Sequence, residues 1–277
     1  MQIHRFTDPR LFLDRCEEWL LQSELQNSTI LAIVHLLAKG EHPFGTPFYM
    51  ATIETGDGLV GCAVRTPPDS LFLANVPVEA VPLLATDIAT VYDSLPGVSG
   101  MEPESLAFAT LWQKQRGDTG TVNHWAWYSL EKVVQPSKPA DGALRLADEN
   151  DLELVREWAP HFASETDTLA DVAAFYERRL RSQTLYMWYD EEPCSLVAVS
   201  AKTPNSVRVS GVYTSPLLRR NGYAGTAVAE VSQLMLDAGY QHCVLFADSS
   251  NPSANRIYQD VGYGPIFNNV SIRLTDS

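Results

Sequence analysis

The sequence predicts an α/β protein made of two units with related topology. Apolar residues at helical spacing alternate with short β-branched runs in both halves of the 277-residue chain. The second half repeats the order of these elements without repeating the residues. A segment with two prolines and a glycine, residues 135–142, separates the halves. We therefore predict a first domain over residues 1–134, a linker over 135–142 and a second domain over 143–277.

The second half alternates regularly between strands and helices. Asp148 is a predicted helix N-cap, and Gly239 ends a helix whose apolar stripe includes Val228 and Val231. β-Branched residues favour the strands between them. In chain order we expect a strand at Ala143–Leu146, helices at Asp151–Trp158 and Leu169–Leu180, a hairpin of Thr184–Tyr189 and Ser195–Thr203, a strand at Val207–Tyr213, a helix at Gly225–Ala238, a strand at Cys243–Ala247, a helix at Pro252–Val261 and a strand at Val270–Leu274.

The first half follows a similar order. Asp8 and Pro9 start a helix, and Gly40 ends a second one. The expected elements are that first helix, a helix at Ile30–Lys39, strands at Phe48–Ile53, Leu59–Arg65 and Leu71–Val76, helices at Val78–Tyr92 and Met101–Gln113, and a long strand at Val122–Val134.

Composition restricts the functional classes. The formal net charge of −14 disfavours general binding to nucleic acid or to an anionic membrane, because both would be repelled. We expect no membrane span, because no run of about 18 apolar residues occurs, and no secretory signal. The scattered cysteines favour reduced core residues and a cytoplasmic location; they are Cys16, Cys62, Cys194 and Cys243.

The segment 212–226 carries the strongest chemical signal. A strand ends there, a short loop turns and a helix begins. The unpaired N–H groups and the dipole of a helix start attract an anion such as a pyrophosphate, and Arg219 and Arg220 add positive charge. A glycine-containing helix start that binds nothing is a common alternative. The patterns of a nucleotide P-loop and of a Rossmann site are both absent from the sequence.

A second block follows this segment at a characteristic distance. Arg219-x-x-Gly222-x-Ala224 resembles the pyrophosphate loop, [QR]xxGx[GA], of the GNAT acyltransferase superfamily. Residues 251–263 resemble the NxxAxxxYxxxGF segment of the same family, with Tyr263 in place of the usual Phe. The resemblance implies that Asn251 caps the helix of this segment. Both blocks, in this order, make the chain similar to a GNAT domain over about residues 144–274.

The resemblance implies the fold, the co-substrate and most of the site. GNAT proteins have a mixed, mostly antiparallel sheet flanked by helices and bind acetyl-CoA at a splayed strand and the pyrophosphate loop. A main-chain N–H near Val212 would stabilise the oxyanion, and Tyr258 would act as the general acid that protonates the departing thiolate. A packed core tyrosine is the alternative for Tyr258. By motif position, the acetyl-CoA-binding residues are Val212, Tyr213, Thr214, Arg219, Arg220, Asn221, Gly222, Tyr223, Ala224, Gly225, Thr226, Asn251 and Asn255.

The general base cannot be read from the motifs. Family members commonly use a glutamate near the central strands, often through water. The candidates are Glu165, His161, Asp248 and Glu192, and a relay through solvent is an equal alternative. The histidines lack metal-ligand spacing, so we expect neither a metal nor a covalent enzyme intermediate.

These observations predict an N-acyltransferase that moves acetyl from acetyl-CoA to a primary amine by direct attack on the thioester. Two alternatives stay open: a CoA-binding sensor or interaction module without turnover, and an enzyme that uses a longer acyl donor. The acceptor would be a small-molecule or peptide amine; the acidic surface slightly favours a cationic one, and a homodimer stays open.

The first half resembles a degenerate GNAT unit, as in tandem GNAT proteins. After its third predicted strand, Pro77 and Pro82 occupy the helix entry where the second half has Gly222 and arginines. Proline removes N–H donors that a phosphate would need. We expect only the second half to bind CoA.

Overall fold

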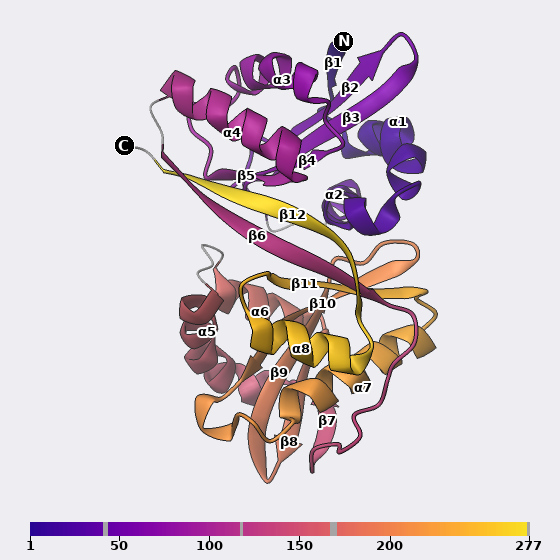
Figure 1. Cartoon of the computed structure of the whole chain (residues 1–277), viewed down its shortest axis with the longest axis vertical. Helices are drawn as coiled ribbons and strands as arrows, with labels where there is room; N and C mark the ends of the chain where they lie inside the picture. Colours follow the sequence, from indigo (N-terminus) through magenta and orange to yellow (C-terminus); the bar gives the residue numbers. More distant parts are fainter. Residues whose placement is uncertain (41–43, 117–118, 167–170, 276–277) are drawn as a thin grey trace. The chain divides into compact units, whose positions relative to one another are not determined.

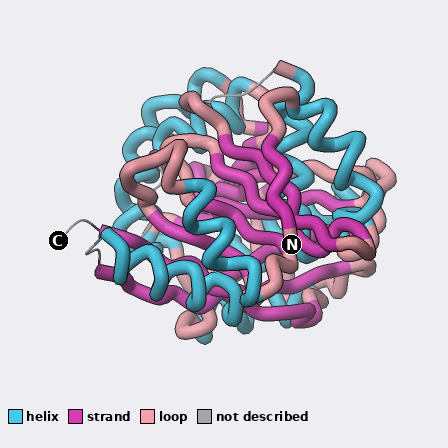
Figure 2. The backbone as a smooth tube through the Cα atoms, turned by 90° about the horizontal axis from the view of Figure 1, so that it is seen from above, coloured by secondary structure: helices cyan, strands magenta, loops and turns pink. Residues whose placement is uncertain are grey.

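The structure is a computed structural model that describes residues 1–40, 44–116, 119–166 and 171–275. It forms two compact units, one of Met1–Ala126 with Phe267–Ser277 and one of Trp127–Ile266. Figure 2, coloured by secondary structure, shows that helices and strands make up most of the backbone. No helix in the described part of the chain is long and apolar enough to cross a bilayer.

The two halves of the chain have the same order of elements, as predicted (Figure 1). The first half contains β1 (Gln2–Arg5), α1 (Pro9–Leu21), α2 (Glu24–Lys39), β2 (Tyr49–Thr55), β3 (Gly58–Arg65), β4 (Leu71–Ala74), the 3-10 turn η1 (Val78–Ala80), α3 (Val81–Ile88), β5 (Gly97–Gly100), α4 (Glu102–Arg116) and β6 (Thr119–Leu130). The second half contains β7 (Ala143–Leu146), η2 (Glu149–Asp151), α5 (Leu152–Thr166), α6 (Val172–Arg181), β8 (Leu185–Asp190), β9 (Glu192–Ser200), β10 (Ser206–Thr214), η3 (Pro216–Leu218), α7 (Tyr223–Asp237), β11 (His242–Asp248), α8 (Pro252–Val261) and β12 (Gly264–Thr275).

The sheet of each unit is mixed and mostly antiparallel, which confirms the predicted fold class. In the first unit the strand order is β1-β2-β3-β4-β5-β12, and in the second it is β11-β10-β9-β8-β7. The pairs β4–β5 and β10–β11 are parallel, and the pairs β1–β2, β2–β3, β3–β4, β5–β12, β7–β8, β8–β9 and β9–β10 are antiparallel. Each parallel pair is joined through a helix, as a parallel connection requires.

Helices cover both faces of the first sheet. One core joins α3 and α4 to alternate residues of β2, such as Tyr49, Ala51 and Ile53. The other core joins α1 and α2 to the opposite face, through residues such as Met50 and Cys62. This alternation follows from the two-residue repeat of a strand.

In the second unit, α5 and α6 cover one face of the sheet. Their buried residues pack with Leu196 and Ala198 of β9 and with Tyr213 of β10. Helix α7 contacts β8, β9 and β10. The alternate residues Val197 and Val199 point to the other face of β9 and are also buried.

Several predicted boundaries differ from the structure. The short strands β1 and β5 were not predicted, because four residues carry too little periodic pattern. The helix expected over Val78–Tyr92 is a 3-10 turn followed by α3, which ends at Ile88. The helix expected from Leu169 starts at Val172; Leu169 itself lies outside the described residues.

The compact units also divide the chain at other places than predicted. Strand β12 pairs with β5 from Gly97 to Gly100, so the end of the chain belongs to the first unit. The expected linker, residues 135–142, lies within the second unit. It is held there by hydrogen bonds, because the Ala140 N–H donates to Thr226 Oγ1 at 3.0 Å and Trp188 Nε1 donates to the Asp141 carbonyl at 2.8 Å.

We predict that Gly97→Ala lowers the free energy of unfolding by about 1–3 kcal/mol, the usual cost of overpacking. A Cβ at Gly97 would lie 2.5 Å from the Ile272 carbonyl oxygen and 2.8 Å from Ser70 Oγ, which forces β5 away from β12. Urea unfolding of the full chain measures the change. Gly56→Ala is the matched control, because its Cβ would have no atom within 4 Å. Equal midpoints for the two variants would contradict the tight β5–β12 pairing.

Candidate functional site

Strand β10 separates from β11 halfway along its length. The two strands pair only at Ser206, Val207 and Arg208 within the described register, whereas the pairing of β10 with β9 continues to Thr214. The register with β9 shifts between Ser210 and Tyr213, which is a β-bulge. The outer part of β10 therefore has one edge that β11 does not cover.

Gly211 makes this bulge. Its φ of +56° lies in the left-handed region, where glycine is favoured. A Cβ at this position would lie 2.8 Å from Cε1 of Tyr176, so a side chain would collide with that ring. The Tyr176 hydroxyl donates a hydrogen bond to the Gly211 carbonyl at 3.0 Å. Helix α6 thus fixes the bulge from one side.

Tyr258 of α8 lies near the same point. Burial raises the pKa of Tyr176, and the nearby phenols of Tyr213 and Tyr258 raise it further. The rings of Tyr258 and Tyr263 meet edge to face at 6.3 Å. Burial also raises the pKa of Tyr258 to about 12, so its hydroxyl stays protonated at neutral pH. No hydrogen bond of this hydroxyl is recorded within the described ranges.

Val212, Tyr213 and Thr214 are the strand residues among the predicted acetyl-CoA contacts, and part of their backbone is already hydrogen-bonded within the protein. The Tyr213 side chain is buried in the core and packs against Trp158 at 5.4 Å between ring centroids. Its carbonyl accepts from Ser195 Oγ at 2.8 Å, and the Thr214 carbonyl accepts from Arg219 Nε at 3.0 Å. Val212, beside the bulge, is half-buried.

The start of α7 has the features of an anion site. Its N-cap is Gly222, with φ +86° and no side-chain hydrogen bond to the first turn. The first turn contains Tyr223, Ala224 and Gly225, and the helix bond from the Thr226 N–H to the Gly222 carbonyl comes after it. The N–H groups of this turn therefore have no side-chain cap. Space around Gly222 is open, with Ala140 Cβ the nearest atom to an added Cβ at 3.8 Å.

Several side chains of the predicted cofactor site make hydrogen bonds within the protein. Arg219 pairs with both carboxylate oxygens of Glu165 at 2.7 and 2.8 Å. Asn221 Nδ2 donates to the Leu218 carbonyl, and the Tyr223 hydroxyl donates to Asp190. Buried Thr226 donates to the Gly222 carbonyl at 3.1 Å. Arg220, at φ +67°, is exposed.

The second motif shapes the start of α8. Asn251 caps the helix as predicted, because its Oδ1 accepts from the Ala254 N–H at 3.0 Å. The Asn255 amide donates to the carbonyls of Asp248 and Asn251, and its Oδ1 accepts from the Tyr128 hydroxyl at 3.0 Å. Asn255 therefore ties α8 to the ends of β11 and β6. These hydrogen bonds fix the position of α8, the helix that carries Tyr258.

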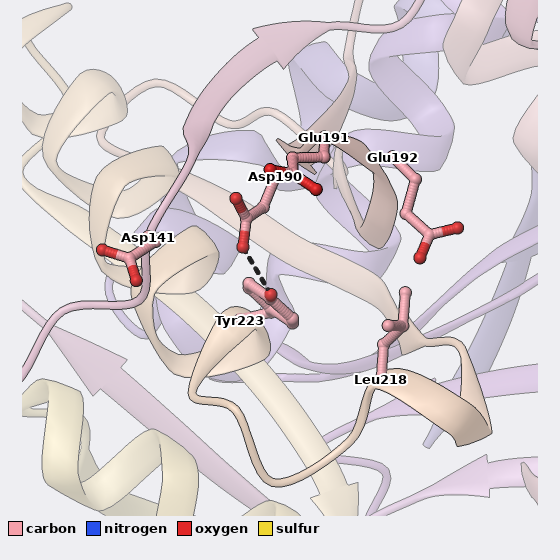
Figure 3. Close-up of a pocket in the computed structure, with 6 residues that line it drawn as sticks. All are labelled: Asp141, Asp190, Glu191, Glu192, Leu218 and Tyr223. Atoms are coloured by element: carbon pink, nitrogen blue, oxygen red, sulfur yellow. Dashed lines mark hydrogen bonds between the residues drawn. The ribbon is translucent and has the colours of Figure 1, made fainter.

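An acidic hollow of about 630 Å³ adjoins the first turn of α7 (Figure 3). Its walls carry four carboxylates together with Leu218 and Tyr223; the carboxylates are Asp141, Asp190, Glu191 and Glu192. They would repel a phosphate placed inside the hollow. A pyrophosphate at this helix start is therefore better placed over the loop that carries Arg219 and Arg220.

The candidate bases have different surroundings. Glu165 is engaged by Arg219, and Asp248 accepts from the N–H and the hydroxyl of Ser250 at 2.7 Å each. His161 is exposed. Glu192 lines the acidic hollow. Of these four groups, Glu165 lies near Tyr213 at the end of the bulge, because its charge adds to the effect of burial in raising the pKa of that phenol.

Gly211 and Tyr176 were not predicted as site residues from the sequence. A glycine inside a strand-like run is a signal for a bulge, and it was available at Gly211. Tyr176 gave no such signal, because an aromatic residue in an amphipathic helix is most often a core residue.

The acetyltransferase (GNAT) family model matches residues 152–263. No curated protein matches the sequence significantly. An acetyltransferase from the GNAT family of Colwellia psychrerythraea has a similar structure, with a TM-score of 0.60, 12% identity and coverage of 99% of this chain and 100% of that one.

Two further solved structures are similar over nearly the whole chain. A Drosophila protein has a TM-score of 0.73 and 11% identity, covering 99% of this chain and 98% of its own. A tandem GNAT protein from the clavulanic acid biosynthesis pathway has a TM-score of 0.56 and 12% identity, with the same two coverages. At such identity these matches show the fold. The family match covers α5 to α8, so residues 152–263 match a GNAT acetyltransferase domain, and the solved structures share its fold.

Proposed function

We propose that this protein transfers an acetyl group from acetyl-CoA to a primary amine. The observation that carries the proposal is the uncapped glycine start of α7, which follows directly on the bulged and unpaired end of β10. A backbone edge for the pantetheine arm and a helix start for the pyrophosphate then adjoin in one unit.

The residues present fit the anionic end of acetyl-CoA through backbone and charge. The first-turn N–H groups of α7 point out of the helix start, and the dipole favours an anion there. Open space at Gly222 allows the phosphates to approach the main chain. Arg220 is exposed beside them, and Arg219 could exchange its exposed pair with Glu165 for a phosphate at little cost, because such surface pairs are weak.

The reaction joins the amine nitrogen to the thioester carbonyl carbon. The C–N bond forms, the carbonyl oxygen carries the negative charge of the intermediate, and the C–S bond then breaks. The ammonium loses two protons overall, one before attack and one as the amide forms, and the CoA sulfur takes up one of them. A backbone N–H near Val212 would stabilise the oxyanion at the uncovered edge of β10.

Tyr258 is proposed to assist the departing sulfur. With a pKa of about 12 the phenol is a weaker acid than an alkyl thiol of pKa about 8.5, so full proton transfer to the thiolate would be uphill. The hydroxyl therefore contributes chiefly by donating a hydrogen bond as charge develops on sulfur. The proton left on CoA at the end comes from the amine through solvent.

The first half of the chain is proposed not to bind CoA. At the corresponding position η1 runs directly into α3, with Pro82 in its first turn. The N-cap of α3 is Ala80 in helical conformation, so α3 continues a preceding turn and offers no open start. This contrasts with Gly222 at the start of α7.

We predict that Gly222→Leu abolishes the thermal stabilisation that acetyl-CoA gives the wild-type protein. A ligand at 100 times its Kd stabilises the folded state by about 2.7 kcal/mol, which a thermal melt detects. Gly239→Leu is the matched control: Gly239 is also left-handed, at φ +101° with no atom near an added Cβ, but lies at the other end of α7. Normal acetyl-CoA binding by Gly222→Leu would contradict the pyrophosphate assignment.

We predict that Tyr258→Phe lowers kcat by about 10–100-fold, the range for loss of a hydrogen bond to a charged group, with little change in affinity for acetyl-CoA. Stopped-flow release of CoA thiol measures the step. Tyr263→Phe is the control, because its hydroxyl bonds to Ser232 at 2.8 Å and takes no part in the proposed chemistry. An unchanged kcat, with chemistry shown to limit the rate, would make Tyr258 a packing residue. Binding of acetyl-CoA without amine-dependent CoA release would favour the sensor instead.

We predict that titration calorimetry of the intact protein gives one acetyl-CoA per chain. The open glycine start of α7 has no equivalent at α3, so the first unit should contribute no second site. Two equivalent acetyl-CoA sites per chain would contradict the assignment of CoA binding to the second half alone.

A further inference from the structure

We propose that Asp190 is a positioning residue of the acetyl-CoA site: it holds Tyr223, and through Tyr223 the first turn of α7, where the pyrophosphate binds. This inference rests on the proposed function and deepens it, because it gives the β8–β9 hairpin, which lies outside both sequence motifs, a part in donor binding. It comes from the acidic hollow beside α7, in which one carboxylate differs from its neighbours (Figure 3).

The contact between Asp190 and Tyr223 joins the hairpin to the helix start. The Tyr223 hydroxyl donates to Asp190 Oδ2 at 2.6 Å, and Figure 3 shows the two side chains pointing toward one another. Hydrogen bonds to an ionised acceptor are among the stronger ones in proteins. This bond raises the pKa of Tyr223, so the phenol stays protonated and keeps donating at neutral pH. The side chain of the first residue of α7 is therefore fixed to the sheet.

The first turn of α7 has little support of its own. Gly222 is the N-cap, at φ +86° and without a side-chain hydrogen bond, and Gly225 follows three residues later. Glycine has the most conformational freedom to lose when a segment is ordered. A turn with two glycines therefore depends on contacts outside it. Tyr223 makes one such contact with Asp190, and Thr226 makes another with the segment before β7.

The hairpin is a suitable anchor, because it belongs to the same sheet as β10. Strands β8 and β9 pair as far as Asp190, and β9 pairs with β10 as far as Thr214. The Cys194 carbonyl also accepts from the Ser215 N–H at 3.2 Å. In the proposed complex the thioester lies at the edge of β10 and the pyrophosphate at α7, joined by a pantetheine arm of limited reach. Anchoring both ends to one sheet preorganises their separation, which lowers the cost of ordering on binding.

The other carboxylates of the hollow have the opposite effect on a phosphate. Asp141, Glu191 and Glu192 line the hollow together with Asp190. Each of them repels an anion bound nearby. Asp190 carries the same charge, but its hydrogen bond to Tyr223 adds a favourable effect. Loss of Asp190 and loss of Glu191 therefore change the charge equally and should change the affinity for CoA in opposite directions.

Calorimetric titration of the full-length protein with CoA measures these changes. Tyr223→Phe and Asp190→Ala should each weaken CoA binding by about 2–30-fold, the range for loss of a contact that supports a site from outside. Glu191→Ala is the matched control for charge and should bind CoA as tightly as the wild type or more tightly. Asp190→Asn retains an acceptor oxygen, so it should keep part of the affinity that Asp190→Ala loses.

A truncated donor separates positioning from a general loss of stability. S-Acetylpantetheine has the thioester and the pantetheine arm but lacks the pyrophosphate and the adenosine. At saturating amine, Tyr223→Phe should raise KM for acetyl-CoA by a factor similar to the loss of CoA affinity, with kcat nearly unchanged. Its kcat/KM for S-acetylpantetheine should equal that of the wild type. An equal loss with both donors would make the hydroxyl of Tyr223 merely structural and overturn the proposal.

The double variant Asp190→Ala/Tyr223→Phe tests whether the two residues act as a pair. Its CoA affinity should equal that of Asp190→Ala alone, because both changes remove the same hydrogen bond. Additive losses would contradict the proposal. So would wild-type CoA binding by Tyr223→Phe, or tighter binding by Asp190→Ala as well as by Glu191→Ala.

Failure of the proposed function has a different signature. In that case the wild-type protein binds CoA, but no amine accelerates the release of CoA from acetyl-CoA. The calorimetric comparison of the variants then still decides the role of Asp190, because it needs no turnover. A wild-type protein that binds no CoA would overturn both the proposed function and this inference.

Discussion

The bulge at Gly211 is the constraint on which the candidate site depends. One extra residue in β10 shifts the register with β9 between Ser210 and Tyr213, and β10 pairs with β11 only up to Arg208. A left-handed backbone and the close Tyr176 ring leave no room for a side chain. Because the bulge redirects the strand, backbone groups that a regular sheet would pair are left available for a ligand. The roles proposed for Tyr258 and for the start of α7 both depend on a ligand that binds at this edge of β10.

Side chains around the site mostly support it. Asn255 ties three segments together, Thr226 holds the segment before β7, and Arg219 bonds to Glu165 and to the end of β10. These contacts fix the geometry of the loop and of α8. In the proposed function, the phosphates are recognised mainly by main-chain N–H groups, which are rigid and need no particular side chain.

Local charge and net charge have separate consequences in this protein. The chain carries a formal net charge of −14, and four carboxylates line the hollow beside α7. Nevertheless, Arg208 of β10 lies against the rings of Trp127 and Phe246, and burial lowers its pKa to about 10. Short-range contacts in a region of low dielectric outweigh the screened field of distant surface groups. The sign of a ligand is thus decided by the few groups that it touches.

The sequence by itself determined the α/β class, the related order of the two halves, the GNAT-like second half and the cap at Asn251. These features arise from local periodicity, from capping chemistry and from two closely spaced motifs, all of which lie within short stretches of chain. Only the tertiary structure decided that β12 pairs with β5, that Asn255 bonds to Tyr128 and Thr226 to Ala140, and that Trp127, Arg208 and Phe246 meet. Each of these contacts joins residues far apart in the chain, and a local pattern contains no information on which distant partner a segment selects.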